Sequence, residues 1–303
     1  MNAATHESDG GAAAARWSLG QSGPAYIRRP VGRVHTDRPV NQRGMFSGDE
    51  VTRAETLSLL GIDWDWSGVD FVAIGGRNDT VAVERSLARF RANLAVIVWD
   101  AARLEGNNFT LPEVQTLLDG VTVEGKRIED QQQVLALNEA YNELERLVRT
   151  GDFRLTKQVS DKLHSLVARH EAIESGRFRG EGSVNGGGSV RLSSGGVVEG
   201  REHGKGGLRL VEAFNDLMDY LDGVDDPRQK ALLYAASATR HQFYFDGNKR
   251  TAKLMASGVL MSAGFDAISV PFSRLYEQNV SLDRLFSTDD ATSYMNLVAD
   301  CAR

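Results

Sequence analysis

Apolar residues recur at steps of three and four positions along most of the chain from residue 80 onward. This spacing places them on one face of a helix, so it predicts a mainly α protein whose helices pack as a bundle. We expect one long amphipathic helix from Thr80 to Leu104. The other helices are expected over 112–118, 131–149, 155–174, 208–222, 227–240, 248–263, 272–285 and 289–301.

Two of these helices carry clear start signals. Thr110 stands before Pro112 and Glu113, which is typical of a capped helix with proline in its first turn. In the same way, Asp226 stands directly before Pro227.

Residues 180–207 interrupt the helical pattern with dense glycine. The short β-prone pieces 189–192 and 197–198 lie inside this segment and predict an exposed hairpin, which would form a small flap. A flexible glycine-rich linker is the alternative that the composition allows.

Composition limits the class of protein. The chain has 303 residues, 41% of them hydrophobic, and a formal charge of −6, which allows a sizeable core and argues against general affinity for nucleic acid. The single Cys301 cannot form an intramolecular disulfide. The start lacks the regions of a signal peptide, and the longest apolar run, 94–99, is too short to span a bilayer. We therefore expect a cytoplasmic protein with neither a membrane nor a nucleic-acid partner.

The first 48 residues are rich in Gly, Ala, Arg and Pro and show no sustained apolar period. Such a segment cannot bury enough apolar surface to offset its ordering entropy. We interpret residues 1–48 as a flexible N-terminal arm.

The segment 246–250, Asp-Gly-Asn-Lys-Arg, lies between two strongly apolar helical patterns. A glycine before a helix start lets backbone N–H groups converge on one point, and the helix dipole makes that point favourable for an anion. Lys249 and Arg250 add positive charge where it opposes the dipole, and a bound phosphate would remove that conflict. An ordinary solvated turn is the alternative.

The sequence HQFYFDGNKRTAK at 241–253 resembles the active loop of the Fic family, H-x-F-x-[D/E]-G-N-G-R-x-x-R. The resemblance implies a helical Fic core over 126–303 with a small β-hairpin flap over 180–207. It also implies that Asp246 holds Mg²⁺, that Gly247 and Asn248 line a phosphate cradle, and that Arg250 binds a phosphate.

The loop departs from the family pattern at three positions. Gln242 stands where the general-base histidine is expected, and His241 lies one residue too early. Either the loop absorbs an extra residue so that His241 reaches inward, or the base is absent. Lys249 replaces a glycine, as in the Doc-type kinase toxins of the family, and Lys253 replaces the final arginine with a point charge.

The segment AARLEGN at 101–107 resembles the inhibitory helix motif [S/T]-x-x-x-E-[G/N] of Fic proteins that carry their inhibitory helix on the N-terminal side. The resemblance places this helix in an N-terminal helical region over 49–125 and implies that Glu105 pairs with Lys253. Ala101 lacks the hydroxyl of the first motif position. His164 and His170 have no partner at metal-ligand spacing, so we expect solvated or capping roles for them.

The resemblance implies a nucleotide-dependent enzyme that uses ATP and Mg²⁺, with AMP transfer to a protein hydroxyl as the leading hypothesis and Glu105 as its inhibitor. Phosphoryl transfer of the Doc type is a second hypothesis, because of Lys249. A nucleotide- or protein-binding pseudoenzyme is a third, because of Gln242. The resemblance implies a target protein as partner, and the sequence is also compatible with a homo-oligomer.

Overall fold

The computed structural model describes residues 53–77 and 81–302. The predicted arm over 1–48 lies outside these residues. The described residues form a helical protein with a small two-stranded sheet, which confirms the predicted fold class. The helices are α1 (Arg53–Leu60), α2 (Ala82–Ala92), α3 (Leu94–Leu104), α4 (Leu111–Leu118), α5 (Ile128–Arg149), α6 (Lys157–Val167), α7 (Leu208–Asp222), α8 (Pro227–His241), α9 (Asn248–Ser262), α10 (Leu275–Thr288) and α11 (Thr292–Asp300).

Short 3₁₀ helices complete the described elements, and two strands form the sheet. β1 (Val190–Arg191) pairs antiparallel with β2 (Val197–Val198), so the predicted hairpin is confirmed. The 3₁₀ helices are η1 (Trp66–Gly68), η2 (Phe71–Ala73), η3 (Lys205–Gly207) and η4 (Phe272–Arg274).

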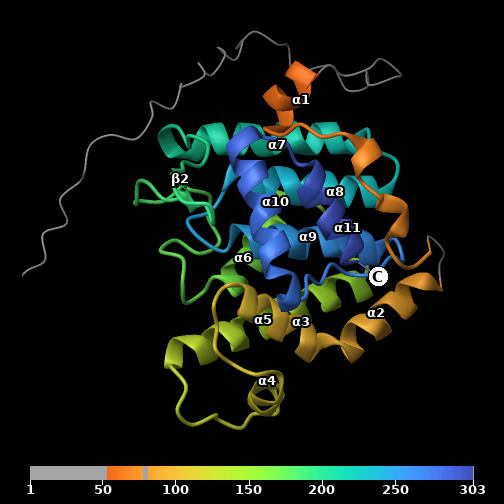
Figure 1. Ribbon diagram of the computed structural model, residues 1–303, viewed down its shortest axis with the longest axis vertical. Helices are drawn as coiled ribbons and strands as arrows, with labels where there is room; N and C mark the ends of the chain where they lie inside the picture. The colour runs from red at the N-terminus through yellow and green to blue at the C-terminus, as the bar shows by residue number, and fades with distance from the viewer. Residues whose placement is uncertain (1–52, 78–80, 303) are drawn as a thin grey trace, which may run out of the picture. The chain divides into compact units, whose positions relative to one another are not determined.

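Helices α8 and α9 form the centre of the bundle, as Figure 1 shows. Every residue of α8 from Ala231 onward is buried, as is every residue of α9 except Lys249 and Ser262. They pack on each other, and α9 also contacts α2, α5 and α6, while α8 contacts α7 and α11. Two helices buried on nearly all sides fix the short loop between them at a defined place in the core.

The N-terminal helices α3 and α4 reach this centre through α5, which contacts α9. α3 contacts α4 and α5, and α4 also contacts α5. The predicted cap of α4 is present, because the backbone N–H of Thr110 donates to the Glu113 carboxylate at 2.7 Å. The end of α3, at Leu104, is thereby held close to the core helices.

The expected single helix over 80–104 is wrong, because the chain breaks at Asn93. This residue has φ −105° and ψ 6°, and its Nδ2 donates to the Arg89 carbonyl at 2.9 Å. An asparagine side chain competes with the backbone for such carbonyls, so the helix ends and α3 starts in a new direction. The predicted helix over 155–174 also ends early, at Val167.

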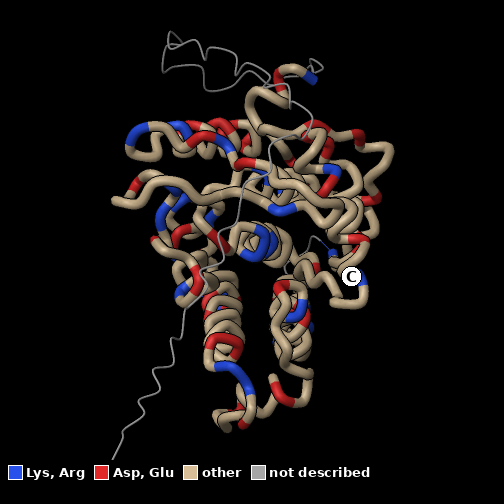
Figure 2. Tube along the Cα trace, turned by 60° about the vertical axis from the view of Figure 1, so that its left-hand side comes forward, with Lys and Arg blue, Asp and Glu red and all other residues tan. Residues whose placement is uncertain are grey.

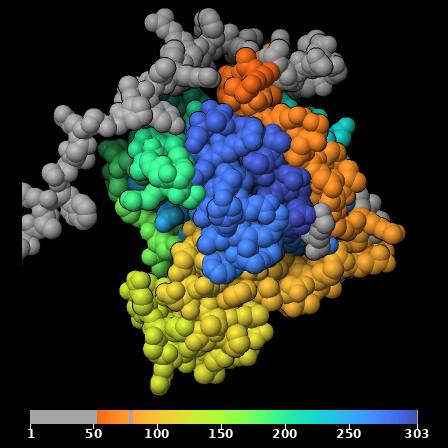
Figure 3. Space-filling view, viewed as in Figure 1, coloured from red at the N-terminus to blue at the C-terminus, as the bar shows by residue number. Residues whose placement is uncertain are grey.

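The hairpin lies against the C-terminal helices. In Figure 3 the segment around β1 and β2 lies beside the helices near the C-terminus on the same face. Ser193 and Ser194 at its tip donate backbone N–H groups to the Asp283 carboxylate of α10 at 2.9 and 2.8 Å. Lys and Arg are interspersed with Asp and Glu along the described chain (Figure 2). None of the described helices is both long and apolar enough to cross a membrane.

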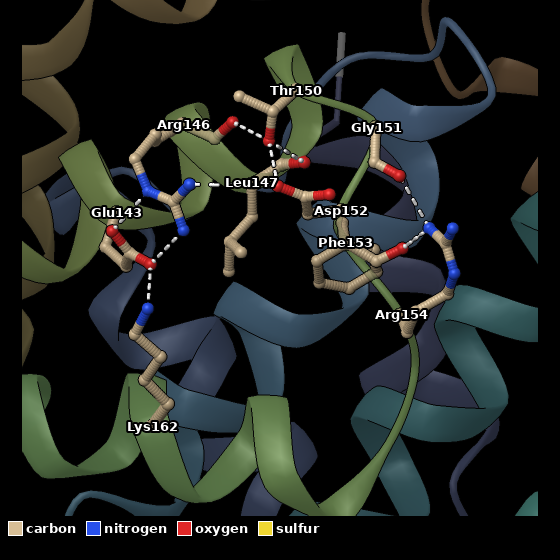
Figure 4. Close-up of polar contacts among 9 residues, drawn as sticks. All are labelled: Glu143, Arg146, Leu147, Thr150, Gly151, Asp152, Phe153, Arg154 and Lys162. Atoms are coloured by element: carbon tan, nitrogen blue, oxygen red, sulfur yellow. Dashed lines mark hydrogen bonds and ion pairs between the residues drawn. The ribbon is translucent and has the colours of Figure 1, made fainter.

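The turn from α5 to α6 directs Phe153 into the core. Figure 4 shows Arg154 donating to the Gly151 and Phe153 carbonyls, each at 2.7 Å, while Thr150 donates to Asp152 at 2.7 Å. Phe153 is buried, and its ring fills the space beside Gly258 of α9. This contact ties the end of α5 to the central helix.

We predict that Gly258→Ala destabilises the protein, although alanine is the better helix former by about 1 kcal/mol. A Cβ at this position would lie 2.2 Å from the Phe153 ring. Such overpacking costs roughly 1–3 kcal/mol in the free energy of unfolding, measured by urea denaturation. Adding Phe153→Leu should recover part of the loss, and a Gly258→Ala variant as stable as wild type would contradict this packing.

Candidate anion site at the start of helix α9

The loop between α8 and α9 is closed by the side chain of Asn248. Its Oδ1 accepts from the Tyr244 N–H at 2.8 Å, and its Nδ2 donates to the Tyr244 carbonyl at 2.7 Å. Gly247 begins α9 with φ 71°, and a Cβ there would lie 3.0 Å from the Cβ of Ala168. Glycine therefore suits both the left-handed backbone and the close contact.

The start of α9 has no side-chain cap. Gly247 stands at the cap position and makes no such hydrogen bond, while its carbonyl accepts the Thr251 N–H at 2.9 Å. The first N–H groups of an α-helix lack intrahelical partners and carry the positive end of the helix dipole. The uncapped helix start thus contains the residues that the sequence predicted for the anion site, Gly247, Asn248, Lys249 and Arg250.

Three cations lie on the first turns of this helix. Arg250 and Lys253 are buried, and Lys249 is partly exposed. Burial lowers the pKa of Lys253 to about 8, although the charge of Glu105 opposes this shift. Burial alone would lower the pKa of Arg250 as well. The hydrogen bonds to Glu171 and the negative charges of Glu105, Glu171 and Asp246 outweigh burial and raise this pKa above its ordinary value.

Glu105 reaches this cluster from the end of α3. Its Oε1 lies 3.3 Å from Lys249 Nζ, whereas the expected partner, Lys253, instead donates to Gln278 Oε1 at 3.2 Å. The predicted ion pair of Glu105 with Lys253 is therefore wrong, and Lys249 takes that place. Burial alone would raise the pKa of Glu105, but the charges of Lys249, Arg250 and Lys253 lower it below its ordinary value.

Gln242, and not His241, faces the loop. Gln242 ends α8 with φ 53°, its Oε1 accepts from Asn248 Nδ2 at 3.0 Å, and its Nε2 donates to the Thr239 carbonyl at 2.7 Å. A neutral amide in this position cannot take a proton from a hydroxyl at neutral pH.

His241 lies on the other side of the helix end. Its Nδ1 is 2.9 Å from the Ser237 carbonyl, its ring stacks on Phe243, and a Cβ on Gly61 would lie 2.9 Å from its Cε1. Burial lowers the pKa of His241 to about 4. These contacts contradict the alternative in which an extra loop residue turns His241 inward.

Asp246 is the candidate metal ligand. Its side chain is 60% exposed, and one oxygen, Oδ1, accepts the Gly247 N–H at 2.6 Å. The described residues contain no group of three or more His, Cys, Asp or Glu suited to a metal. Mg²⁺ at phosphate sites commonly uses one or two carboxylates together with substrate phosphates, so a single accessible carboxylate fits that ion.

His164 of α6 contacts the backbone of the loop. The expectation of a solvated or capping role is therefore wrong for this residue. Its Nε2 lies 2.8 Å from the Asp246 carbonyl, Nδ1 accepts the Gly176 N–H at 2.8 Å, and the ring stacks on Tyr244 at 3.7 Å. Burial lowers the pKa of His164 to about 4, which keeps it neutral. No local feature of the sequence indicated this role.

Arg179 was also missed by sequence reasoning. It is buried, and its guanidinium donates to the carbonyls of Gln242 at 2.6 Å, Gly187 at 3.0 Å and Arg201 at 2.7 Å. A single side chain therefore ties the end of α8 to both arms of the flap. Nothing in the local sequence of Arg179 distinguishes it from a solvated arginine.

Comparison with solved structures identifies the class of fold. The described arrangement matches Fic-1 from *C. elegans* with a TM-score of 0.57, at 21% identity over 74% of this chain and 63% of that one. It matches a Fic domain-containing signaling protein from *Bacteroides thetaiotaomicron* with a TM-score of 0.56, at 19% identity over 74% of this chain and 87% of that one. The protein has the mainly helical Fic fold.

Comparison with curated protein sequences shows similarity at the sequence level. "Protein adenylyltransferase Fic" of *Drosophila willistoni* is 25% identical over 208 residues, and that of *Culex quinquefasciatus* is 26% identical over 216. Each match covers 67% of this chain and 39% of the relative, so the chain spans about two fifths of these proteins. No family model matches the chain. The protein is a distant homologue of the Fic adenylyltransferases.

We predict that stability falls in mild acid because of the buried histidines. His164 has a pKa near 4 when folded, and its ordinary value of 6.5 returns on unfolding, so the unfolded state binds more protons between these pH values. The free energy of unfolding should therefore fall as the pH drops from 6.5 to 4, by about 3 kcal/mol for this histidine, and stay unaffected by it above that range.

His164→Gln should reduce this loss, whereas His170→Gln, at an exposed position of the following turn, should leave it unchanged. Urea denaturation at pH 7 and pH 4.5 measures the difference. A His164→Gln variant with the same pH dependence as wild type would show that His164 is not buried neutral.

Proposed function

We propose that the start of α9 binds the phosphates of ATP and that the protein transfers AMP to a protein hydroxyl, restrained by Glu105. The observation that carries this proposal is the uncapped start of α9 with three cations beside it. Arg250 Nε and Thr251 Oγ1 are also buried there without a hydrogen-bond partner in the described chain. Buried donors without acceptors are costly, and an anion would supply acceptors.

The distant relation to adenylyltransferases supports nucleotide-dependent protein modification. In AMP transfer, the hydroxyl oxygen attacks the α-phosphorus of ATP and the bond to the β-phosphate breaks, which releases pyrophosphate. The proton of the hydroxyl must leave during this step. Asp246 would hold Mg²⁺, which when bound neutralises phosphate charge.

The missing histidine at the expected base position limits the rate that we propose for this transfer. Gln242 occupies that position within hydrogen-bonding distance of Asn248, and His241 is directed away from it. A general base contributes about 10²–10⁴-fold to such a reaction, so transfer should be slow by that factor. The same observation favours a second candidate function, a protein that binds nucleotide without transferring AMP.

We predict that Glu105→Gly tightens binding of ATP with Mg²⁺ and increases self-modification. The change removes the carboxylate that pairs with Lys249. A hydrogen bond to a charged group contributes about 1.5–3 kcal/mol, so affinity should rise about tenfold or more. Calorimetry and labelled ATP measure both effects.

Glu124→Gly is the matched control, because Glu124 is an exposed acid in a turn outside the site. It should change neither affinity nor labelling. Equal affinity and labelling in Glu105→Gly and wild type would remove Glu105 from the proposed restraint.

We predict that Gln242→His, made in the Glu105→Gly protein, accelerates AMP transfer by about 10²–10⁴-fold. Histidine tolerates the left-handed backbone of this position and supplies the missing base. His241→Asn should leave the rate unchanged, since His241 faces Gly61 and Phe243. Mass spectrometry of the product distinguishes added AMP from added phosphate.

Three outcomes decide among the functions. Transfer of AMP by Gln242→His supports the proposal, and an added phosphate replaces it by phosphoryl transfer. Binding of ATP without any transfer, even in Gln242→His, favours the nucleotide-binding protein.

A further inference from the structure

Arg250, the cation deepest in the proposed phosphate site, is already paired with a carboxylate. Its Nη1 and Nη2 donate to the two oxygens of Glu171, each at 2.7 Å. A parallel two-bond contact of this kind is the geometry by which arginine also binds phosphate. Glu171 therefore occupies the bonds that a phosphate on Arg250 would use.

Glu171 is the partner that can leave. The side chain of Arg250 is 3% exposed and fixed in α9, whereas that of Glu171 is 25% exposed. Glu171 lies in the turns that follow α6, outside any helix. The Nε of Arg250 is buried without an acceptor, so Glu171 does not satisfy the whole guanidinium.

The Glu171 carboxylate is also connected to the segment that carries Glu105. Gln133 Nε2 donates to Glu171 Oε1 at 3.2 Å, and Asn107 Nδ2 donates to Gln133 Oε1 at 2.9 Å. Asn107 is buried and lies two residues after Glu105. The Glu171 carboxylate is thus joined through Gln133 of α5 to Asn107, in the segment that carries Glu105.

The charges around the proposed phosphate site are balanced within the described chain. Around the start of α9, Lys249, Arg250 and Lys253 are matched by Glu105, Glu171 and Asp246. A polyphosphate entering next to these carboxylates would meet like charges at short range in a partly buried site. The polyphosphate therefore binds well only when these carboxylates move away from the cations.

We infer that Glu171 is a second acidic competitor for the phosphate site, which holds Arg250 until a nucleotide phosphate displaces it. This inference rests on the proposed nucleotide function and adds a residue that the Fic-like motifs do not contain. Glu105 covers Lys249 and Glu171 covers Arg250, so the site is closed by two carboxylates from separate segments.

The test is calorimetric titration of the full chain with two probes, ATP with Mg²⁺ and inorganic pyrophosphate. Glu171→Gln should bind both about tenfold more tightly than wild type, because the amide competes more weakly than a carboxylate for Arg250. Glu139→Gln is the matched control. It removes the same charge from an exposed pair with Arg169, and affinity should stay within about twofold.

Gln133→Ala provides a second variant should Glu171→Gln fold poorly. It removes one hydrogen bond from Glu171 and leaves the carboxylate in place, so it should tighten binding in the same direction by a smaller factor. Glu171→Asp retains the charge and should stay close to wild type, which separates competition from a purely structural role. Thermal unfolding of each variant shows that it is folded.

The outcomes separate the inference from the function on which it rests. If Glu105→Gly binds ATP more tightly but folded Glu171→Gln and Gln133→Ala do not, the inference is overturned and the proposed function stands. Tighter binding in Glu171→Gln without AMP transfer in any variant supports the inference and overturns the transfer. Binding of neither probe by any variant overturns both.

Discussion

The start of α9 concentrates positive charge in the core of the protein. An uncapped helix end and three cations within its first turns lie where most neighbouring residues are buried. Such a cluster is stable only when negative groups are close, because buried charge without a partner is strongly unfavourable. In the described chain those groups are carboxylates brought from α3, from the turns after α6 and from the loop itself.

The surrounding residues make this loop rigid. Asn248 closes it, His164 supports the Asp246 carbonyl from α6, and Arg179 ties the end of α8 to the flap. These residues are buried and hydrogen-bonded, so the geometry of the helix start is fixed before any ligand arrives. The Glu105 and Glu171 side chains are more exposed than Arg250. A rigid cationic site with displaceable acidic side chains is suited to regulated anion binding.

The Fic fold supplies the scaffold, while function depends on the individual residues of the loop. Gln242 stands where the family resemblance would place a histidine base, and its amide oxygen accepts a hydrogen bond from Asn248. The loop is therefore well formed for phosphates and poorly equipped for proton removal.

Helical periodicity predicted most of the helices, and the hairpin followed from short β-prone pieces among glycines, because these signals are local. Asn93 ended a helix that the apolar pattern would have continued, since periodicity does not register side-chain competition for backbone carbonyls. Loop residues 246–250 were predicted from the helix start that follows them.

The acidic partners were not predictable in the same way. Glu105 pairs with Lys249 and not with Lys253, and Glu171 pairs with Arg250. Both pairings depend on how α3, α6 and α9 pack. His164 and Arg179 gave no local signal, because each reaches the end of α8 or the loop after it through a residue more than sixty positions away.

Amide hydrogen exchange at the start of α9 tests the central claim most directly. The backbone N–H groups of residues 248–250 lie at the uncapped helix end, where a bound phosphate would accept from them. In the Glu105→Gly protein, ATP with Mg²⁺ should slow exchange at these amides and leave α4 unchanged. Exchange at 248–250 that is the same with and without saturating ATP would contradict an anion site at this helix start.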